Sequence, residues 1–229
     1  MKEKSRDYVA VVYNEQDRPL TAYPEKLARF LFERFDLKPG NRLLDVGCGR
    51  GEFLQGFIQC GAVGFGVDQS RAAENYCPDA TLKISDIEND GIPYEDNFFD
   101  VVYSKSVIEH FYYPERMVKE IFRVLKPGGT VITLCPDWEF NYRIYFEDYT
   151  HRTLFMQSSL RDIFLIHGFS NVMAERFRQL PVLWGAGKFL LPLAELTRVF
   201  VPHQLKPYSK WIRFSKEIML ISRATKPLE

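Results

Sequence analysis

The residues best suited to chemistry gather at a glycine-rich turn. Residues 44–51 read LDVGCGRG, so that glycine recurs at positions 47, 49 and 51 and Asp45 stands two residues before the first of them. Glycine permits a tight turn and lets a ligand approach the backbone closely. In doubly wound sheets a turn of this kind, between a strand and a helix, binds a nucleotide-like ligand. The turn therefore predicts such a ligand without saying which one.

Two further acids, Asp68 and Asp86, each follow a short apolar run. A carboxylate at the end of a second strand can accept hydrogen bonds from both hydroxyls of a ribose, in nicotinamide sites as well as in others. Dinucleotide enzymes usually carry their third glycine one residue later than this chain, which has Glu52 there. The spacing therefore favours a nucleoside other than a nicotinamide dinucleotide. For Asp86 there is an alternative to a role in ligand binding, which is to cap a turn or a helix.

Two of the four histidines, His110 and His151, are candidate catalytic bases. His110 follows the apolar run 99–103, and His151 lies beyond the run 130–134, close to Asp148. An imidazole can accept a proton near neutral pH, which would help a hydroxyl acceptor to react. A metal site built from these two histidines is an open but weak alternative, because the sequence shows no tight ligand spacing, and we expect none.

Short apolar runs alternate with amphipathic stretches of helical length, and these elements must position the acids and histidines. We expect strands at 42–46, 63–68, 82–84, 99–103, 130–134, 169–177 and 217–222, and helices at 21–35, 51–60, 114–125 and 158–167, with a short one near residue 71. This alternation predicts an α/β fold with a doubly wound, mostly parallel sheet and helices on both faces.

Taken together, the motifs resemble those of class I methyltransferases that use S-adenosylmethionine. The glycine turn, Asp68, the triplet 85–87, the segment 99–110 and the turn RVLKPGG at 123–129 occur in that family's order, and the resemblance covers about 40–136, with a weaker echo to 177. It implies a seven-stranded Rossmann-like sheet and S-adenosylmethionine as the cofactor. The cofactor contacts that it implies are Asp45, Gly47, Cys48, Gly49, Asp68, Gln69, Asp86, Ile87 and Ser104.

Some of these roles stay open. Asp45 could hold the glycine loop through backbone N–H groups, or it could lie near the methionine amino group of the cofactor. The resemblance assigns Asp86 to the adenine amino group and Ile87 to the face of the ring. We expect the thiol of Cys48 to pack rather than to act as a nucleophile, because the sequence shows no partner base for it.

The chain divides into four expected parts. These are an N-terminal helical cap at 1–40, the cofactor-binding core at 41–178, a helical lid or insertion at 179–216, and the last strand with its tail at 217–229. Within the insertion Lys188, Glu195 and Arg198 gather toward one side of a helix and leave a broad apolar face. Four basic residues follow, interleaved with aromatic ones, namely Lys206, Lys210, Arg213 and Lys216 with Tyr208, Trp211 and Phe214. The segment 181–216 could lie on an anionic membrane surface, or it could pack on the domain or on a second subunit.

Composition limits the partners. The chain has 229 residues, with 30 basic and 30 acidic ones, and this balance argues against nucleic acid as a partner. Its four cysteines form no C-x-x-C pair and no secretory segment opens the chain, so we expect a reduced, cytoplasmic protein, monomeric or homodimeric, with membrane association as an alternative.

The expected activity is methyl transfer from S-adenosylmethionine to a small-molecule, glycan-precursor or lipid-linked acceptor, at a hydroxyl group. Such a transfer needs an aligned nucleophile and, for a hydroxyl, removal of its proton. Two alternatives stay open: methylation of a quinone or aromatic-lipid ring, and an inactive module that only binds the cofactor.

Overall fold

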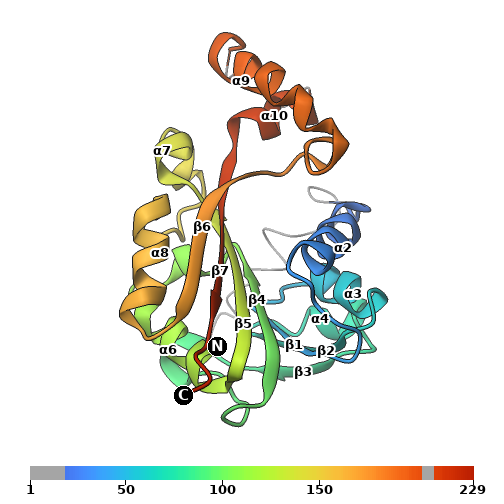
Figure 1. Ribbon diagram of the computed structural model, residues 1–229, viewed down its shortest axis with the longest axis vertical. Coiled ribbons are helices and arrows are strands. Elements are labelled where there is room, and N and C mark those ends of the chain that lie inside the picture. Colours follow the sequence, from blue (N-terminus) through green and yellow to red (C-terminus); the bar gives the residue numbers. More distant parts are fainter. Residues whose placement is uncertain (1–18, 203–208) are drawn as a thin grey trace, which may run out of the picture.

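The structure is a computed structural model that describes residues 19–202 and 209–229. Figure 1 shows one twisted sheet with helices on both faces. Its strands are β1 (Arg42–Val46), β2 (Val63–Asp68), β3 (Thr81–Ile84), β4 (Phe99–Lys105), β5 (Leu125–Pro136), β6 (Ser170–Arg178) and β7 (Ile218–Thr225). They lie in the order β3-β2-β1-β4-β5-β7-β6, and β7 runs antiparallel to both of its neighbours. The predicted seven-stranded, mostly parallel, doubly wound sheet is confirmed.

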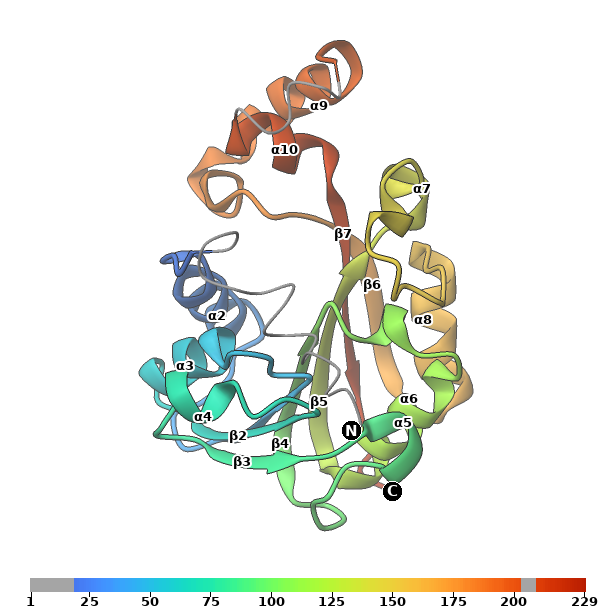
Figure 2. The ribbon, with the colours of Figure 1, turned by 180° about the vertical axis from the view of Figure 1, so that it is seen from behind.

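Helices cover the two faces of this sheet as separate groups (Figures 1 and 2). One group comprises α2 (Tyr23–Arg34), α3 (Glu52–Gln59) and α4 (Ala73–Tyr76), and the other comprises α5 (Ile87–Asp90), α6 (Pro114–Val124) and α8 (Gln157–Ile166). In α6 the buried side chains Met117, Val118, Ile121 and Val124 recur at helical spacing. Each face therefore buries its own apolar cluster, and the sheet lies between the two.

Short helical segments follow the strands at the carboxyl edge of the sheet. They are the 3-10 helix η1 (Ile108–His110) after β4, and the helix α7 (Trp138–Asn141) with the 3-10 helix η2 (Tyr145–Glu147) after β5. The carboxyl ends of β1, β2, β3, β4 and β5 meet at this edge because these strands are parallel neighbours. Ligands of open α/β sheets bind beyond such an edge, where the strand order reverses.

The segment between β6 and β7 projects beyond this same edge (Figure 1). Its described part contains the 3-10 helices η3 (Pro181–Leu183) and η4 (Ala186–Leu190), followed by α9 (Leu191–Phe200) and α10 (Lys210–Lys216). The predicted basic and aromatic positions Lys206 and Tyr208, and residues 1–18 of the predicted N-terminal cap, lie outside the described residues. Among the helices of the described segments, none is long and apolar enough to cross a membrane.

Candidate functional site

The glycine-rich turn after β1 is held by backbone hydrogen bonds to β2. The Gly47 N–H donates to the carbonyl oxygen of Val67 at 2.8 Å. Gly47 has φ +73°, and a Cβ at this position would lie 2.4 Å from a methyl carbon of Val107, in the loop after β4. A side chain at 47 would therefore meet both backbone strain and a clash. The turn thus packs directly against the loop that carries His110.

Asp68, at the end of β2, fixes the outer part of the same turn. Its carboxylate accepts hydrogen bonds from the N–H of Gly49 and the N–H of Ser70, both at 2.8 Å. Asp68 thus supplies support of the glycine loop, which is one of the two roles left open for Asp45, and both roles of Asp45 stay open. A carboxylate offers about four lone-pair sites, so these two bonds do not exclude a further bond from a ligand hydroxyl.

Asp45 is a buried acid beside this second carboxylate. Only 3% of the residue is exposed, and it lies opposite Gly66 of β2 and Tyr103 of β4. Burial, together with the negative charge of Asp68, raises the pKa of Asp45 to about 8, although Lys105 acts in the opposite direction. Two acids in one partly closed site favour a ligand that brings positive charge and hydrogen-bond donors.

The other predicted cofactor contacts lie around the same edge. Gln69 is exposed just after Asp68, and Ile87 is buried against the core. Asp86 caps α5, because its carboxylate accepts from the N–H groups of Glu88 and Asn89 at 3.2 and 3.3 Å. The capping role of Asp86 is thus realised, and it does not exclude a ligand contact.

Ser104 and Cys48 are both buried. The Ser104 hydroxyl, in β4, has no hydrogen-bond partner in the described part of the chain. The Cys48 sulfur packs toward β2, where a Cβ on Gly66 would lie 2.9 Å from it. Burial raises the pKa of the Cys48 thiol far above its usual range, so packing suits this side chain better than nucleophilic attack.

His110 and His151 lie side by side, with ring centroids 4.9 Å apart, although 41 positions separate them in the sequence. His110 ends η1, and its Nδ1 lies 2.8 Å from the hydroxyl of Thr150. His151 has its Nδ1 2.5 Å from the carbonyl oxygen of Tyr145. Burial, reinforced by His151, lowers the pKa of His110 to about 4, so that this imidazole is neutral at neutral pH.

Glu109 is the residue of this site that the sequence reasoning missed. It is 0% exposed, and neither of its carboxylate oxygens has a hydrogen-bond partner within the described ranges. Burial raises its pKa to about 8. Its position directly before His110 was the only signal in the sequence, since burial without a partner depends on the tertiary packing.

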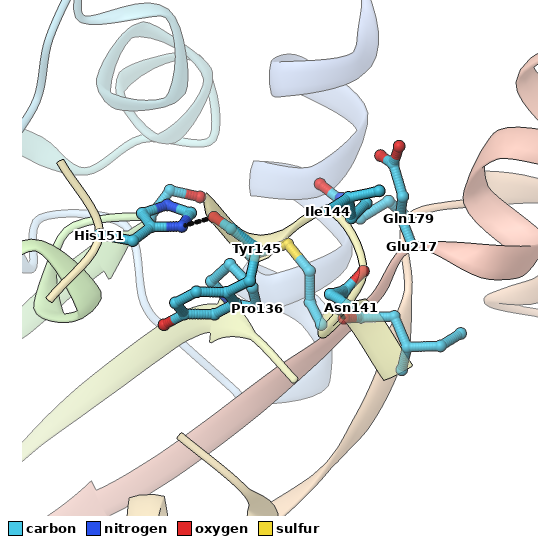
Figure 3. A pocket seen from close by; sticks show the side chains of 10 residues that line it. Pro136, Asn141, Ile144, Tyr145, His151, Gln179 and Glu217 are labelled. Atoms are coloured by element: carbon cyan, nitrogen blue, oxygen red, sulfur yellow. Dashed lines mark hydrogen bonds between the residues drawn. The ribbon is translucent and has the colours of Figure 1, made fainter. Parts of the chain in front are cut away.

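A pocket opens beside His151 at the carboxyl edge of the sheet (Figure 3). It is lined by Ser106, Pro136, Asn141, Ile144, Tyr145, His151, Gln179, Glu217, Ile218 and Met219. The residues Gln179 and Glu217 mark the two points where the insertion leaves β6 and returns to β7. The pocket therefore lies between His151 and the base of the insertion.

The site thus has two halves on neighbouring parts of one edge. The carboxyl ends of β1 and β2 supply the glycine turn with two acids, and the loops after β4 and β5 supply two imidazoles and a buried acid. Val107 joins the halves, because it contacts the Gly47 position and begins the turn that ends at His110, whose N–H donates to its carbonyl oxygen at 2.9 Å. Such an arrangement can hold a charged nucleoside in one half and a protic acceptor in the other.

Comparisons with known proteins point to one family. The family model described as a methyltransferase domain matches residues 13–174. Sterol 24-C-methyltransferase erg6 of Schizosaccharomyces pombe is 38% identical over 120 residues, which make up 47% of this chain and 32% of that protein. A ubiquinone biosynthesis O-methyltransferase of Coxiella burnetii is 29% identical over 136 residues, or 56% of this chain and 57% of that protein. The matches thus span less than two thirds of either relative.

Solved structures share the fold at low sequence identity. A chain in the complex of the Haloferax volcanii Trm112 methyltransferase activator has a TM-score of 0.72 at 20% identity, covering 98% of this chain and 100% of its own length. A SAM dependent methyltransferase from Archaeoglobus fulgidus has a TM-score of 0.66 at 20% identity, with coverage of 96% and 100%. Phosphoethanolamine N-methyltransferase 2 of Haemonchus contortus, in complex with S-adenosyl-L-methionine, has a TM-score of 0.63 at 21% identity, with coverage of 88% and 52%.

Proposed function

This chain belongs to the methyltransferase domain family, and from that premise we propose that it transfers the methyl group of S-adenosylmethionine to a hydroxyl of a small, amphipathic acceptor. The class I resemblance is confirmed by the family match, and S-adenosylmethionine is the cofactor that goes with it. The observation that carries the proposal is the convergence of His110 and His151 beside a pocket, next to the glycine turn. The acceptor is then a metabolite, a glycan precursor or a lipid-linked molecule.

The chemistry of the first half of the site fits the cofactor. S-adenosylmethionine supplies a methyl group on a positively charged sulfonium, and it also carries an amino group and two ribose hydroxyls. Asp68 would accept hydrogen bonds from the ribose, and the ionised form of Asp45 would face the positive charge. At Gly49 a Cβ would meet nothing within 4 Å, so the backbone there is open to a close approach by the ligand.

The second half would activate the acceptor. A hydroxyl is a weak nucleophile until its proton leaves, and the imidazole of His151, which lines the pocket, can accept that proton. The ring of His110 packs against it and is the poorer base, because burial lowers its pKa. In the transfer, the acceptor oxygen forms a bond to the methyl carbon while the carbon–sulfur bond breaks and leaves its electron pair on sulfur. The products are the methyl ether, S-adenosylhomocysteine and one proton. The protein's main contribution is to hold the oxygen, the carbon and the sulfur in line.

Calorimetric titration with S-adenosylmethionine, S-adenosylhomocysteine and NAD tests the cofactor half. We expect the two sulfur nucleosides to bind and NAD not to bind. Asp68→Ala should weaken binding by roughly 10-fold or more, since a charge-assisted hydrogen bond contributes ~1.5 to 3 kcal/mol. The matched control is Asp79→Ala, at an exposed turn position, which should bind as the wild type does. A folded protein that binds neither sulfur nucleoside would refute the proposal.

An outward apolar face on α9 supports an amphipathic acceptor. The polar side of α9 faces the body of the protein: Glu195 forms ion pairs with Arg178 and Arg198, and Thr197 accepts a hydrogen bond from the indole of Trp211. The opposite side exposes a stripe at helical spacing that we call the α9 stripe, made up of Leu193, Leu196, Val199 and Phe200, which are 51%, 54%, 59% and 74% exposed. An amphipathic helix with its apolar side outward is suited to a membrane interface.

Charge favours an anionic lipid surface as the occupant of the α9 stripe. The segment 179–216 has six basic residues and one acidic residue, although the whole chain has equal numbers of the two. We therefore propose that this segment contacts anionic lipid and brings the pocket at its base close to a lipid-linked or amphipathic acceptor.

Co-sedimentation with phosphatidylcholine vesicles, with and without phosphatidylglycerol, tests this contact. We expect the wild type to bind only the anionic vesicles, and Leu196→Ser/Val199→Ser to lose most of this binding because each change removes apolar area from the interface. The control pair Leu165→Ser/Ile166→Ser makes a similar exchange at exposed positions of α8 and should bind normally. Wild-type protein that stays in solution with both vesicle types would refute the lipid contact and leave the methyltransferase proposal standing.

Methylation of a quinone-type aromatic ring compound is the second candidate. The Coxiella burnetii relative bears the name of a ubiquinone biosynthesis O-methyltransferase, and the aromatic ring of Tyr145 lies in the pocket lining here. Mass analysis of lipid extracts incubated with the protein and a labelled methyl donor would separate the two, since a labelled quinol ring and a labelled glycan differ in mass and chromatography. No label in any extract would favour the inactive binding module.

A further inference from the structure

The two histidines and the buried acid beside them form a cluster of three side chains of metal-ligating types. Glu109, His110 and His151 each offer one ligand atom, and the three atoms lie within 4.8 Å of one another. Atoms bound ~2.1 Å from one tetrahedral ion lie about 3.4 Å apart, so closing around an ion requires two side chains at the limit of this range to approach each other by about 1.4 Å. Tight spacing in sequence could not indicate this cluster, because His151 comes from a different loop.

Backbone hydrogen bonds fix the two loops against each other. The carbonyl oxygen of Glu109 accepts from the N–H of Arg152 at 2.8 Å and from the N–H of Thr153 at 3.0 Å. The segment that carries His151 is therefore tied to η1, which carries the other two side chains. The convergence thus rests on main-chain bonds as well as on side-chain rotamers.

The partners of the ring nitrogens set the tautomers of both imidazoles. A carbonyl oxygen can only accept, so the Nδ1 of His151 carries the proton in its bond to Tyr145. The Thr150 hydroxyl donates to Asp148 at 2.5 Å and therefore accepts from the Nδ1–H of His110. In each neutral ring the lone pair then sits on Nε2. Outer partners of this kind, a carbonyl and a hydroxyl-linked carboxylate, orient imidazoles that bind metals.

The carboxylate of Glu109 gives a second observation, independent of the cluster geometry, that points to a bound cation. It is completely buried, and both of its oxygens lack a hydrogen-bond partner among the residues that the structure describes. A buried carboxylate without a partner is costly unless a charge is matched to it or it takes up a proton. A cation at the cluster would provide the missing partner.

We propose that Glu109, His110 and His151 form a binding site for one divalent first-row transition-metal ion. Two imidazole nitrogens and one carboxylate oxygen suit Zn²⁺, Fe²⁺, Mn²⁺ or Co²⁺ better than the all-oxygen sites that Mg²⁺ and Ca²⁺ prefer. Three protein ligands leave coordination positions open, as in catalytic rather than structural sites. His151 also lines the pocket, so an open position of the ion would face it.

The role of this ion rests on the proposed function. Bound to the acceptor hydroxyl, a divalent ion lowers the pKa of that group, and the proton leaves to water while the oxygen takes the methyl group. The ion would then replace direct proton transfer to the imidazoles, because their Nε2 lone pairs would be engaged. Metal binding itself is independent of the identity of the acceptor.

Titration of the chelator-treated full chain with Co²⁺ tests the site, because the visible spectrum of Co²⁺ reports its ligands. We expect one equivalent to bind and to change the spectrum, and Glu109→Gln and His151→Gln each to weaken binding by ~100-fold or more. Thr150→Val should weaken it by about 10-fold, as the loss of an outer partner does. A matched control is His167→Gln, which removes an imidazole outside the cluster and should bind Co²⁺ as the wild type does.

The melting temperature of Glu109→Gln shows whether a loss of metal binding comes from misfolding. The neutral amide nearly matches the shape of the acid, so the variant should melt no lower than the metal-free wild type, and added Zn²⁺ should raise the melting temperature of the wild type only. Wild-type protein that binds no Co²⁺, or variants that bind it as tightly as the wild type, would overturn the proposal and leave Glu109 as a protonated acid. Binding of S-adenosylmethionine, measured separately, distinguishes failure of the metal site from failure of the methyltransferase proposal.

Discussion

Asp45 lowers the stability of the ligand-free protein at alkaline pH, because its buried carboxyl must then ionise. Folding buries its carboxyl near Asp68 and raises its pKa to about 8. The folded state therefore holds a proton that the unfolded chain releases at about pH 4, and the free energy of unfolding falls as the pH rises between these two values. A cofactor with positive charge would remove this cost by stabilising the ionised form.

Asp45→Asn should separate stability from binding. At pH 8 we expect the variant without cofactor to be more stable than the wild type by roughly 1 to 3 kcal/mol, because no buried charge has to form. Near pH 4 the difference should disappear, while binding of S-adenosylmethionine at pH 8 should weaken by ~10-fold or more. Urea unfolding followed across this pH range measures the first effect, and calorimetry measures the second. A stability difference that is constant with pH would contradict the assignment.

Single residues also mark how far sequence reasoning could reach. The sequence could place Asp45 and Asp68 beside the glycine turn, because each stands at or near the end of an apolar run, and their contacts with the cofactor stay a prediction. The carboxylate of Glu109 was not predictable, since its burial without a partner arises only when the loops after β4 and β5 pack together. His110 and His151 were chosen one by one as bases, and their ring contact could not be derived from their separation along the chain.

At the scale of elements, the turn between β1 and α3 depends on the small size of Gly47. Gly47→Ala should destabilise the protein through a left-handed backbone angle and a contact of 2.4 Å with Val107. The control Gly40→Ala has φ +85° and open space around its Cβ, so it isolates the backbone strain. We expect Gly40→Ala to cost ~1 kcal/mol and Gly47→Ala at least twice as much, with weaker binding of S-adenosylmethionine in the latter only. If the two variants lose the same free energy of unfolding in heat or urea, the loop after β4 moves away and relieves the contact with Val107.

Element types were more predictable than their orientations. Apolar runs of strand length and helices between them gave the sheet, because burial on both faces leaves a recognisable pattern. For α9 the pattern predicted one polar side and one apolar side. Which side faces the protein depends on residues of other elements. Arg178 pairs with Glu195, and the ring of Phe140 lies under Arg198. The indole of Trp211 donates to Thr197. The outward α9 stripe is therefore a property of the assembled fold.

The whole molecule places the two halves of the site at one reversal of strand order. From β1 the chain proceeds to β2 and β3 on one side and then crosses to β4 and β5 on the other. The glycine turn and Asp68 consequently lie on one side of the crevice, and the histidine pair lies on the other. The insertion between β6 and β7 extends from the same edge (Figure 2), so that its outward face and the pocket lie at the same end of the molecule.

Charge distribution across the molecule gives the last prediction. The chain as a whole has no formal net charge, so attraction to anionic lipid must come from the local excess in 179–216 and should weaken with salt. Replacing its exposed lysines, Lys188→Gln/Lys210→Gln, should reduce binding to phosphatidylglycerol vesicles by ~30-fold, at about 1 kcal/mol for each lysine near the surface.

The control pair Lys26→Gln/Lys119→Gln makes the same change at exposed positions of α2 and α6. We expect it to bind like the wild type in 0.1 M salt, and both the wild type and the control to dissociate as the salt concentration rises. Equal losses for the two pairs would mean that the net charge of the molecule governs binding rather than this segment. In that case the α9 stripe would need an occupant other than lipid, and a second copy of the chain, detectable by sedimentation, would be the next to test.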